Sequence, residues 1–280
     1  MKANVRDNDR ERENQEEYTQ SVQSAADDFS HNDEDTVYDL LAGYRDENGT
    51  VHNTFTLREM NGTDEEAIHR GDVKTNGAKM STVLLTRCVT SIGSITKKGM
   101  NPKEWENIIK SLLVGDRDII LMELRRQSIG ETIEVTHTCL NPNCKARLKT
   151  SVDLDELEIV PFDGLWEIPF ELPKGYRDKK GELHRKGIMR RANGLDGEVL
   201  TPLAKNNLAK AETTMLTRLC KFDDGVHVDD TVMASLSVKD RNYLQSVMNE
   251  HLFGINMTIP VMCDRCGEEF QGSLNQTNFM

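Results

Sequence analysis

One segment of this chain occurs twice. Residues 43–52 read GYRDENGTVH and residues 175–184 read GYRDKKGELH, so a Gly-Tyr-Arg-Asp sequence is followed by glycine and histidine at identical spacing. The agreement continues into Asn-Gly-x-Asp-x-Glu motifs that begin at Asn61 and at Asn193. An internal repeat constrains architecture strongly, because each copy is expected to form the same supersecondary unit. We therefore expect two duplicated lobes.

Each copy closes on a pair of cysteines. Cys139 and Cys144 flank Leu-Asn-Pro-Asn, whereas Cys263 and Cys266 flank Asp-Arg and precede Gly267. Zinc prefers four sulfur or nitrogen ligands in a tetrahedron, and a cysteine pair on a tight turn supplies two of them. Lobes that meet at a seam would bring the two turns together. The pattern predicts one structural zinc held by these four cysteines, with a zinc-ribbon-like hairpin in each lobe.

Other roles for the thiols and histidines remain open at this level. Two separate redox dithiols would need a cysteine of low pKa at a helix N-terminus, whereas these turns join strands. His137 could replace one sulfur ligand. Cys88 and Cys220 occupy equivalent apolar positions and are expected to be core thiols. His52 and His184 follow the repeated turns without a second ligand at helical spacing, so we expect structural or surface histidines.

Composition limits the classes of partner. The chain has 280 residues, a net charge of −12 and a hydrophobic content of 37%, which suffices for two modest cores. The negative charge argues against nucleic acid and anionic membranes as partners. No run of about 18 apolar residues predicts a membrane span, and the N-terminus lacks the apolar stretch of a signal peptide. Closely spaced cysteines in a reducing compartment are typical of metal sites.

The excess of acid is concentrated at the N-terminus, where residues 1–35 carry eleven carboxylates against four basic residues. Such a segment cannot bury enough apolar surface to offset its ordering entropy. We predict an acidic, intrinsically disordered arm over residues 1–36, an N-terminal lobe over 37–155 and a duplicate C-terminal lobe over 156–280. The arm is either a solvated tail or a segment that orders on a partner.

The periodicity predicts an α+β fold in which each lobe combines a β-hairpin, helices and the cysteine hairpin. Residues 37–58 are expected to form a first hairpin, since Asn48-Gly49 favours a tight turn, and residues 168–190 are expected to repeat it with Lys179-Lys180-Gly181 as the turn. Asn101 and Pro102 predict the start of a helix, and Asp116 is predicted to cap the next one. Alternating residues on both sides of the cysteine turns predict strands.

Motifs of catalysis are missing from the sequence. There is no His-Glu-x-x-His zinc motif, no phosphate-binding glycine loop, no nucleophile elbow and no kinase signature. A site closed by four thiolates also lacks the open position that a catalytic zinc needs. We expect a protein that is not an enzyme.

Several motifs in this order resemble a known family. They are a Leu-Pro strand followed by glycine (residues 170–175), a Leu-Leu-x-Arg-x-Val-x-Ser-Ile run (84–92), an Asp-Arg helix that leads to Leu-Arg-x-x-Ser-x-Gly (112–130), a Val-Asp-Leu after the first cysteine pair (152–154), and Cys-x-x-Cys-Gly before Phe279. Together they resemble the baseplate hub proteins of T-even-like contractile-tailed bacteriophages and related injection systems. The resemblance spans roughly residues 37–280. Pro173 has no counterpart at Leu41, and the first cysteine pair is more widely spaced.

The resemblance implies a structural or assembly component of the tail baseplate, present in several copies around the tail axis. Its expected partners are tube, spike, wedge or tape-measure proteins, and its expected location is the virion tail after synthesis in the host cytoplasm. Two alternatives remain: a tail-assembly chaperone absent from the mature particle, and a zinc-ribbon adaptor that binds nucleic acid. Lys145, Arg147 and Lys149, which alternate beside the first cysteine pair, favour the last.

Overall fold

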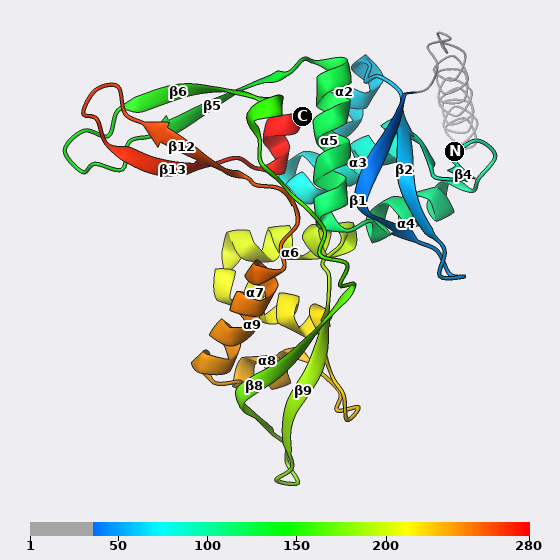
Figure 1. Ribbon diagram of the computed structural model, residues 1–280, viewed down its shortest axis with the longest axis vertical. Helices are drawn as coiled ribbons and strands as arrows, with labels where there is room; N and C mark the ends of the chain where they lie inside the picture. Colours follow the sequence, from blue (N-terminus) through cyan, green and yellow to red (C-terminus); the bar gives the residue numbers. More distant parts are fainter. Residues whose placement is uncertain (1–35) are drawn as a thin grey trace, which may run out of the picture. The chain divides into compact units, whose positions relative to one another are not determined.

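The computed structural model describes residues 36–280, of which 37–280 form one compact unit. The expected arm over residues 1–36 lies outside this part of the chain, apart from Thr36. The described residues form a mixed α+β structure with several small sheets (Figure 1). None of the helices in residues 36–280 is long and apolar enough to cross a membrane.

The first half of the described chain begins with an antiparallel sheet in the order β1-β2-β3-β4 and ends in a long hairpin. Helices lie between the strands in sequence. The elements are β1 (Val37–Arg45), β2 (Val51–Leu57), α2 (Gly62–Ile68), η1 (Val73–Thr75), α3 (Gly77–Cys88), β3 (Val89–Ile92), β4 (Ile95–Thr96), α4 (Pro102–Ser111), α5 (Val114–Ser128), β5 (Thr132–Thr138), β6 (Arg147–Asp153), η2 (Leu154–Glu156) and β7 (Ile159–Val160).

The second half follows a comparable order, with a three-stranded sheet β10-β9-β8 and a final hairpin. Strand β11 returns to pair with β7. The elements are β8 (Glu167–Arg177), β9 (Leu183–Arg190), α6 (Gly194–Asn206), α7 (Leu208–Leu219), β10 (Cys220–Phe222), α8 (Asp230–Ser235), α9 (Val238–Glu250), β11 (Gly254–Ile255), β12 (Thr258–Met262), β13 (Glu269–Ser273) and η3 (Gln276–Phe279).

Helix α4 starts where the sequence predicts. The Asn101 side chain accepts a backbone N–H of the first turn, and Pro102 occupies a position whose missing N–H is not needed. One face of the helix is apolar and faces the core, which buries Trp105, Ile108 and Ile109. The Asn101 cap therefore sets where the helix begins, and burial of its apolar face holds it against the core.

The prediction that Asp116 caps the next helix is wrong. The N-cap of α5 is Leu113, and Asp116 lies inside the first turn, fully buried. Its Oδ1 accepts the N–H groups of Leu41 (2.7 Å) and Ala42 (3.0 Å), and its Oδ2 accepts that of Gly43 (3.0 Å). The register of β1 against β2 shifts in this stretch, and buried N–H groups without a strand partner need another acceptor. Asp116 therefore accepts hydrogen bonds from the backbone N–H groups of β1 and does not cap helix α5.

The buried apolar side chains form two clusters. The first collects side chains from β1 to β6, with Phe55 and Trp105 among the largest, and also takes in C-terminal residues such as Val261 and Phe279. The second is smaller and is built around Phe222 from β8, β9, β10 and helices α7 to α9. The C-terminal hairpin therefore packs with the first cluster, although the rest of the second half has its own core.

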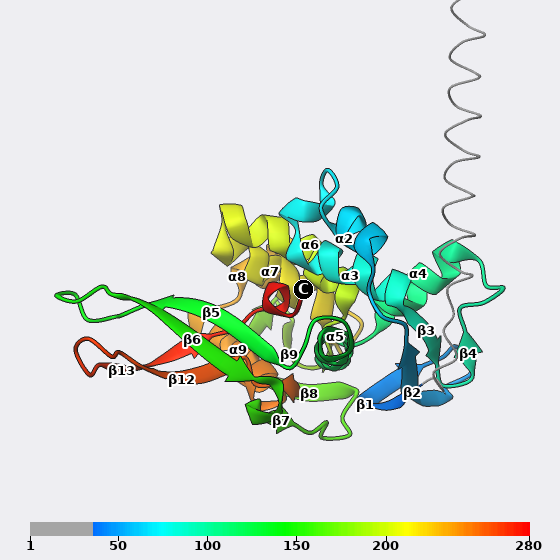
Figure 2. The same ribbon diagram turned by 90° about the horizontal axis from the view of Figure 1, so that it is seen from above.

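The two long hairpins β5–β6 and β12–β13 lie side by side in both views (Figures 1 and 2). Each is antiparallel with an unbroken register, from Thr132↔Asp153 to Thr138↔Arg147 in the first and from Thr258↔Ser273 to Met262↔Glu269 in the second. Their connecting turns carry the four paired cysteines. This arrangement brings segments far apart in sequence to one place.

Candidate metal centre

Each cysteine pair lies on a turn that strand hydrogen bonds close. In the first turn the Cys139 N–H donates to the Ala146 carbonyl at 2.9 Å. In the second the Cys263 N–H donates to the Glu268 carbonyl at 2.8 Å, and the Gly267 N–H returns to the Cys263 carbonyl at 2.8 Å. Both turns thus hold their two sulfur atoms on one side of a tight backbone loop.

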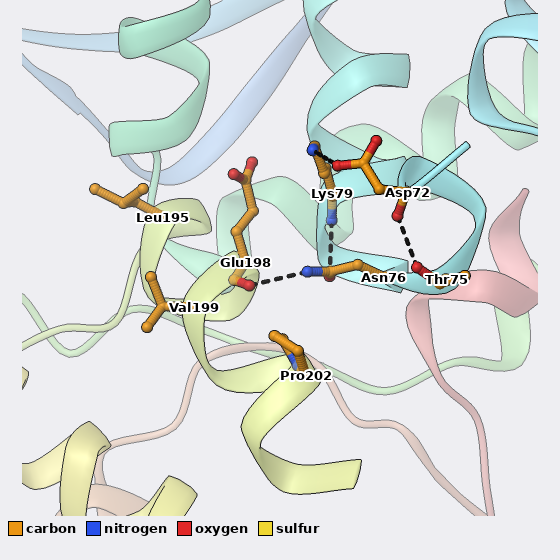
Figure 3. A pocket seen from close by; sticks show the side chains of 8 residues that line it. All are labelled: Asp72, Thr75, Asn76, Lys79, Leu195, Glu198, Val199 and Pro202. Carbon is orange, nitrogen blue, oxygen red and sulfur yellow. Dashed lines mark hydrogen bonds and ion pairs between the residues drawn. The ribbon is translucent and has the colours of Figure 1, made fainter. Parts of the chain in front are cut away.

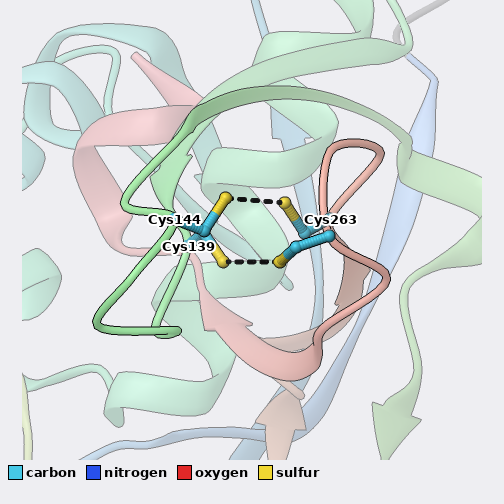
Figure 4. Close-up of side chains that lie close together, drawn as sticks. Cys139, Cys144 and Cys263 are labelled. Atoms are coloured by element: carbon cyan, nitrogen blue, oxygen red, sulfur yellow. Dashed lines mark hydrogen bonds between the residues drawn. The ribbon is translucent and has the colours of Figure 1, made fainter.

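The four sulfur atoms converge across the two hairpins (Figure 4). Cys139 Sγ lies 3.6 Å from Cys266 Sγ, and Cys144 Sγ lies 3.8 Å from Cys263 Sγ. All four lie within 4.8 Å of one another. Four sulfurs at about 2.3 Å from a central zinc would lie about 3.8 Å apart in a regular tetrahedron. The spacing is therefore compatible with a metal site formed by these four cysteines.

Accessibility differs within the group. Cys139 and Cys263 are buried, Cys144 is half-buried and Cys266 is exposed. One side of the cluster thus faces the core, and the other lies near the surface. A cation held here would be shielded by the first core on one side only.

The thiol pKa values diverge. Desolvation raises the pKa of Cys263, but the N–H groups of Arg265 and Cys266 donate to its sulfur and bring the pKa to about 7. At Cys266 the N–H of Glu268 lowers the pKa, but desolvation and hydrogen bonding with the neighbouring thiols outweigh it and raise the pKa to about 12. Without a metal, Cys263 therefore ionises more readily than Cys266. A bound cation removes this difference, because thiols that ligate a metal are deprotonated.

The residue after each second cysteine has left-handed backbone. Gly267 has φ of +74°, and Lys145, at the same place in the first turn, has φ of +45° and is the one non-glycine residue of the described chain with positive φ. Left-handed backbone costs an ordinary residue about 1–2 kcal/mol. The same turn geometry thus recurs with glycine in one hairpin and lysine in the other.

This difference predicts unequal effects of alanine at the two positions. Gly267→Ala should lower the free energy of unfolding by about 1–2 kcal/mol, because alanine is strained there although nothing lies within 4 Å of its Cβ. Lys145→Ala should change it by less than about 0.5 kcal/mol, since that position already carries a Cβ. Urea unfolding of both variants measures the difference. Equal losses would contradict the assignment of strain.

The remaining sulfur and histidine candidates lie elsewhere. Cys88 and Cys220 are buried free thiols in the two cores, and burial raises the pKa of each to about 12. His137 packs edge-on against Phe270, and a Cβ on Gly272 would lie 2.7 Å from its Cε1. The four sulfurs gather without it. His52 and His184 are buried, and they lie close to the turns of the β1–β2 and β8–β9 hairpins.

Sequence reasoning missed the buried carboxylates. Asp64 and Asp196 occur in the repeated Asn-Gly-x-Asp motif, and each accepts bonds from two arginines while completing a capping box. Recurrence of an aspartate in both copies was the available signal. In the sequence this recurrence marks the repeat alone, and only the structure shows the hydrogen bonds that each aspartate accepts.

A shallow groove separates helices α3 and α6 (Figure 3). It measures about 380 Å³ and is lined mainly by polar side chains together with Leu195, Val199 and Pro202. The Asn76 side chain donates to the Glu198 carbonyl at 2.9 Å across it. This hydrogen bond joins the first half of the chain to the second, and nothing in the lining of the groove points to a ligand.

Comparison with known protein families adds independent information. Residues 56–183 match the family model of the T4 bacteriophage base plate protein. The match begins within β2, includes Cys139 and Cys144, and ends at the start of β9. No curated protein matches the chain, and no solved structure matches it. The baseplate match supports a structural component of a phage baseplate, which implies association with other baseplate proteins and location in the virion tail.

Proposed function

We propose that the chain is a structural and assembly component of the hub region of a contractile phage tail baseplate. The match of residues 56–183 to the T4 base plate family carries this proposal. The chain acts by binding tube, spike, wedge or tape-measure proteins, in several copies around the tail axis, and has no catalytic role. It is made in the host cytoplasm and remains in the finished virion.

The four cysteines hold a structural zinc in this proposal. Sulfur–sulfur distances of 3.6 and 3.8 Å across the two hairpins support tetrahedral coordination, and thiolates are ligands that zinc accepts readily. Four thiolates leave no open position for a substrate. The zinc would tie the C-terminal hairpin to β5–β6 and thereby fix the path of the chain after the second core.

We further propose that residues 37–155 and 156–280 are duplicated lobes. Their first hairpins support this: Tyr44 pairs with His52 as Tyr176 pairs with His184, each beyond a register shift. The left-handed glycines that precede the two tyrosines have φ of +85° and +84°. Bulges at corresponding positions of the two hairpins support a common origin, because the turn sequence alone does not produce a bulge in the strand.

Buried acid networks give further support for duplication. In the first half Asp64 accepts bonds from Arg58 and Arg87, and in the second Asp196 accepts bonds from Arg190 and Arg218. A buried aspartate on a later helix also accepts N–H groups from the bulged strand in each half. Two lobes of one fold would present similar but different faces, which suits a part that contacts unlike neighbours.

Composition of the particle tests the functional proposal. Purified tails or baseplates should contain the chain at a fixed ratio to tube protein, measured by quantitative mass spectrometry. A tail-assembly chaperone would instead be found in infected cells and be missing from finished particles. Absence from intact tails would therefore refute the hub proposal while leaving the zinc site unaffected.

The nucleic-acid adaptor is the second alternative. Arg147 and Lys149 lie on β6 with exposed side chains, which is its best support. A net charge of −12 opposes binding to phosphate. A gel shift with DNA and RNA over a series of salt concentrations decides this point, and salt-sensitive binding would favour the adaptor.

A further inference from the structure

A second cluster of potential ligands lies at the tip of the β8–β9 hairpin, apart from the cysteines (Figure 1). Asp178, Glu182 and His184 each place one ligand atom within 4.8 Å of the others. Asp178 and Glu182 flank the turn, and His184 lies two residues further on with its side chain 5% exposed. Two carboxylates and one imidazole are a common ligand set for divalent transition cations.

The hydrogen bonds of His184 define its protonation. Its Nδ1 lies 2.5 Å from Asp224 Oδ2, and because a carboxylate can only accept, Nδ1 carries the proton. In the neutral ring Nε2 is then an acceptor. That nitrogen is buried and has no hydrogen-bond partner within residues 36–280. A carboxylate behind the other ring nitrogen is the usual partner of a metal-binding histidine.

Asp178 presents a free oxygen to this nitrogen. Its Oδ1 accepts the N–H groups of Lys180 (2.9 Å) and Glu182 (2.8 Å), which orients the carboxylate. Its Oδ2 lies 3.8 Å from His184 Nε2, beyond hydrogen-bonding distance. A lone pair on nitrogen therefore faces a carboxylate oxygen, and a cation between them would satisfy both.

The other hairpin of the chain provides an internal comparison. It has the same aspartate and histidine, but His52 Nε2 lies 3.4 Å from Asp46 Oδ2 and so has a partner. Thr50 occupies the position of Glu182. On the far side of the ring, a Cβ on Gly93 would lie 2.7 Å from His52 Nδ1, where His184 has a carboxylate. The ligand set is therefore complete in one hairpin only.

We propose that Asp178, Glu182 and His184 form a binding site for one divalent transition cation, with Asp224 as the positioning residue behind the histidine. Three protein ligands leave at least one coordination position for water or for a donor from a neighbouring molecule. The cation would pin the turn to the buried histidine and so stiffen the hairpin tip. This inference does not depend on the baseplate role or on the four-cysteine site.

Proton binding is the main competitor of a cation here. The hydrogen bond that His184 Nδ1 donates to Asp224 raises the pKa of His184, and the imidazolium form fits between Asp178 and Asp224 without any metal. The test must therefore detect the metal itself and its position. Mn²⁺ suits this purpose, because carboxylate sites bind it and thiolate sites select softer metals.

Full-length protein is titrated with Mn²⁺ at mildly alkaline pH, and free Mn²⁺ is measured by electron paramagnetic resonance. We expect one Mn²⁺ per chain. Glu182→Thr, which copies the residue of the other hairpin, should weaken binding by at least about tenfold. The matched control Glu47→Thr removes an exposed carboxylate from the tip of the other hairpin and should leave binding unchanged.

Paramagnetic broadening of amide NMR signals locates the ion. Signals of residues 178–184 should disappear first, while those of residues 46–52 persist. Because Glu182 is exposed, its replacement does not threaten the fold. No Mn²⁺ binding, equal binding by the Glu182→Thr variant, or broadening centred elsewhere would each overturn the proposal.

Discussion

Cys263→Ser is expected to abolish stoichiometric zinc binding and to lower the melting temperature by about 10–20 °C. Structural zinc contributes directly to folding, and loss of about 5 kcal/mol in a chain of this size shifts the melting temperature by that much. Serine cannot supply the thiolate that pairs with Cys144 at 3.8 Å. Elemental analysis of purified protein, with thermal unfolding followed by circular dichroism, measures both effects.

Cys88→Ser is the matched control. Cys88 is equally buried but does not belong to the group of four converging cysteines, so its variant should keep one zinc per chain even if it is less stable. Treatment of the wild-type protein with a strong chelator should reproduce the loss seen with Cys263→Ser. Full zinc content in that variant would remove the basis for a four-cysteine zinc site.

Asp64→Asn is expected to lower the free energy of unfolding by about 3 kcal/mol, because it breaks a buried, charge-assisted network. The fully buried carboxylate accepts bonds from Arg58 at 2.7 Å and Arg87 at 2.5 Å. Asp72→Asn is the control. Asp72 pairs with Lys79 on the surface, where solvent screens the ion pair, so its replacement should leave the free energy of unfolding nearly unchanged. Urea unfolding at neutral pH compares the two.

The Asp64 effect should also depend on pH in one direction. Burial raises the pKa of this carboxyl, but the bonds from Arg58 and Arg87 outweigh it and lower the pKa from 3.8 to about 2. A carboxyl with a depressed folded-state pKa stabilises the protein above its unfolded pKa and loses that contribution as pH falls. The gap between wild type and Asp64→Asn should therefore shrink between about pH 4 and pH 2. A constant gap would argue against an ionised Asp64.

Local chemistry accounts for what could be predicted along the chain. The repeated Gly-Tyr-Arg-Asp sequence followed by glycine predicted both tip turns, with Asn48-Gly49 in the first and Lys180-Gly181 in the second. The cap at Asn101 predicted the start of α4, since these features depend on neighbours in sequence. The prediction for Asp116 is wrong because its partners are distant in sequence. Its partners are the N–H groups of residues 41–43, which no local pattern connects to it.

The sequence likewise predicts only part of the candidate metal centre. The spacing within each pair predicts Cys139, Cys144, Cys263 and Cys266 as metal ligands, because a tight turn between strands places two sulfur atoms on the same side of the backbone. Spacing could not tell which sulfurs would become neighbours across the pairs, and Cys139 lies next to Cys266 while Cys144 lies next to Cys263. The three residues of the second ligand cluster are close in sequence, but the burial of His184 and its hydrogen bond to the distant Asp224 depend on tertiary structure.

Hydrogen bonds and backbone preferences within a few residues suffice to form the two tip hairpins, the capped helix and the paired-cysteine turns, so these features follow from the amino-acid sequence. Tertiary structure alone decided that the C-terminal hairpin packs with the first core through residues such as Val261 and Phe279. It also decided which polar groups would be buried together. Those outcomes depend on burial of apolar surface between distant segments, a non-directional force that leaves no local mark on the sequence.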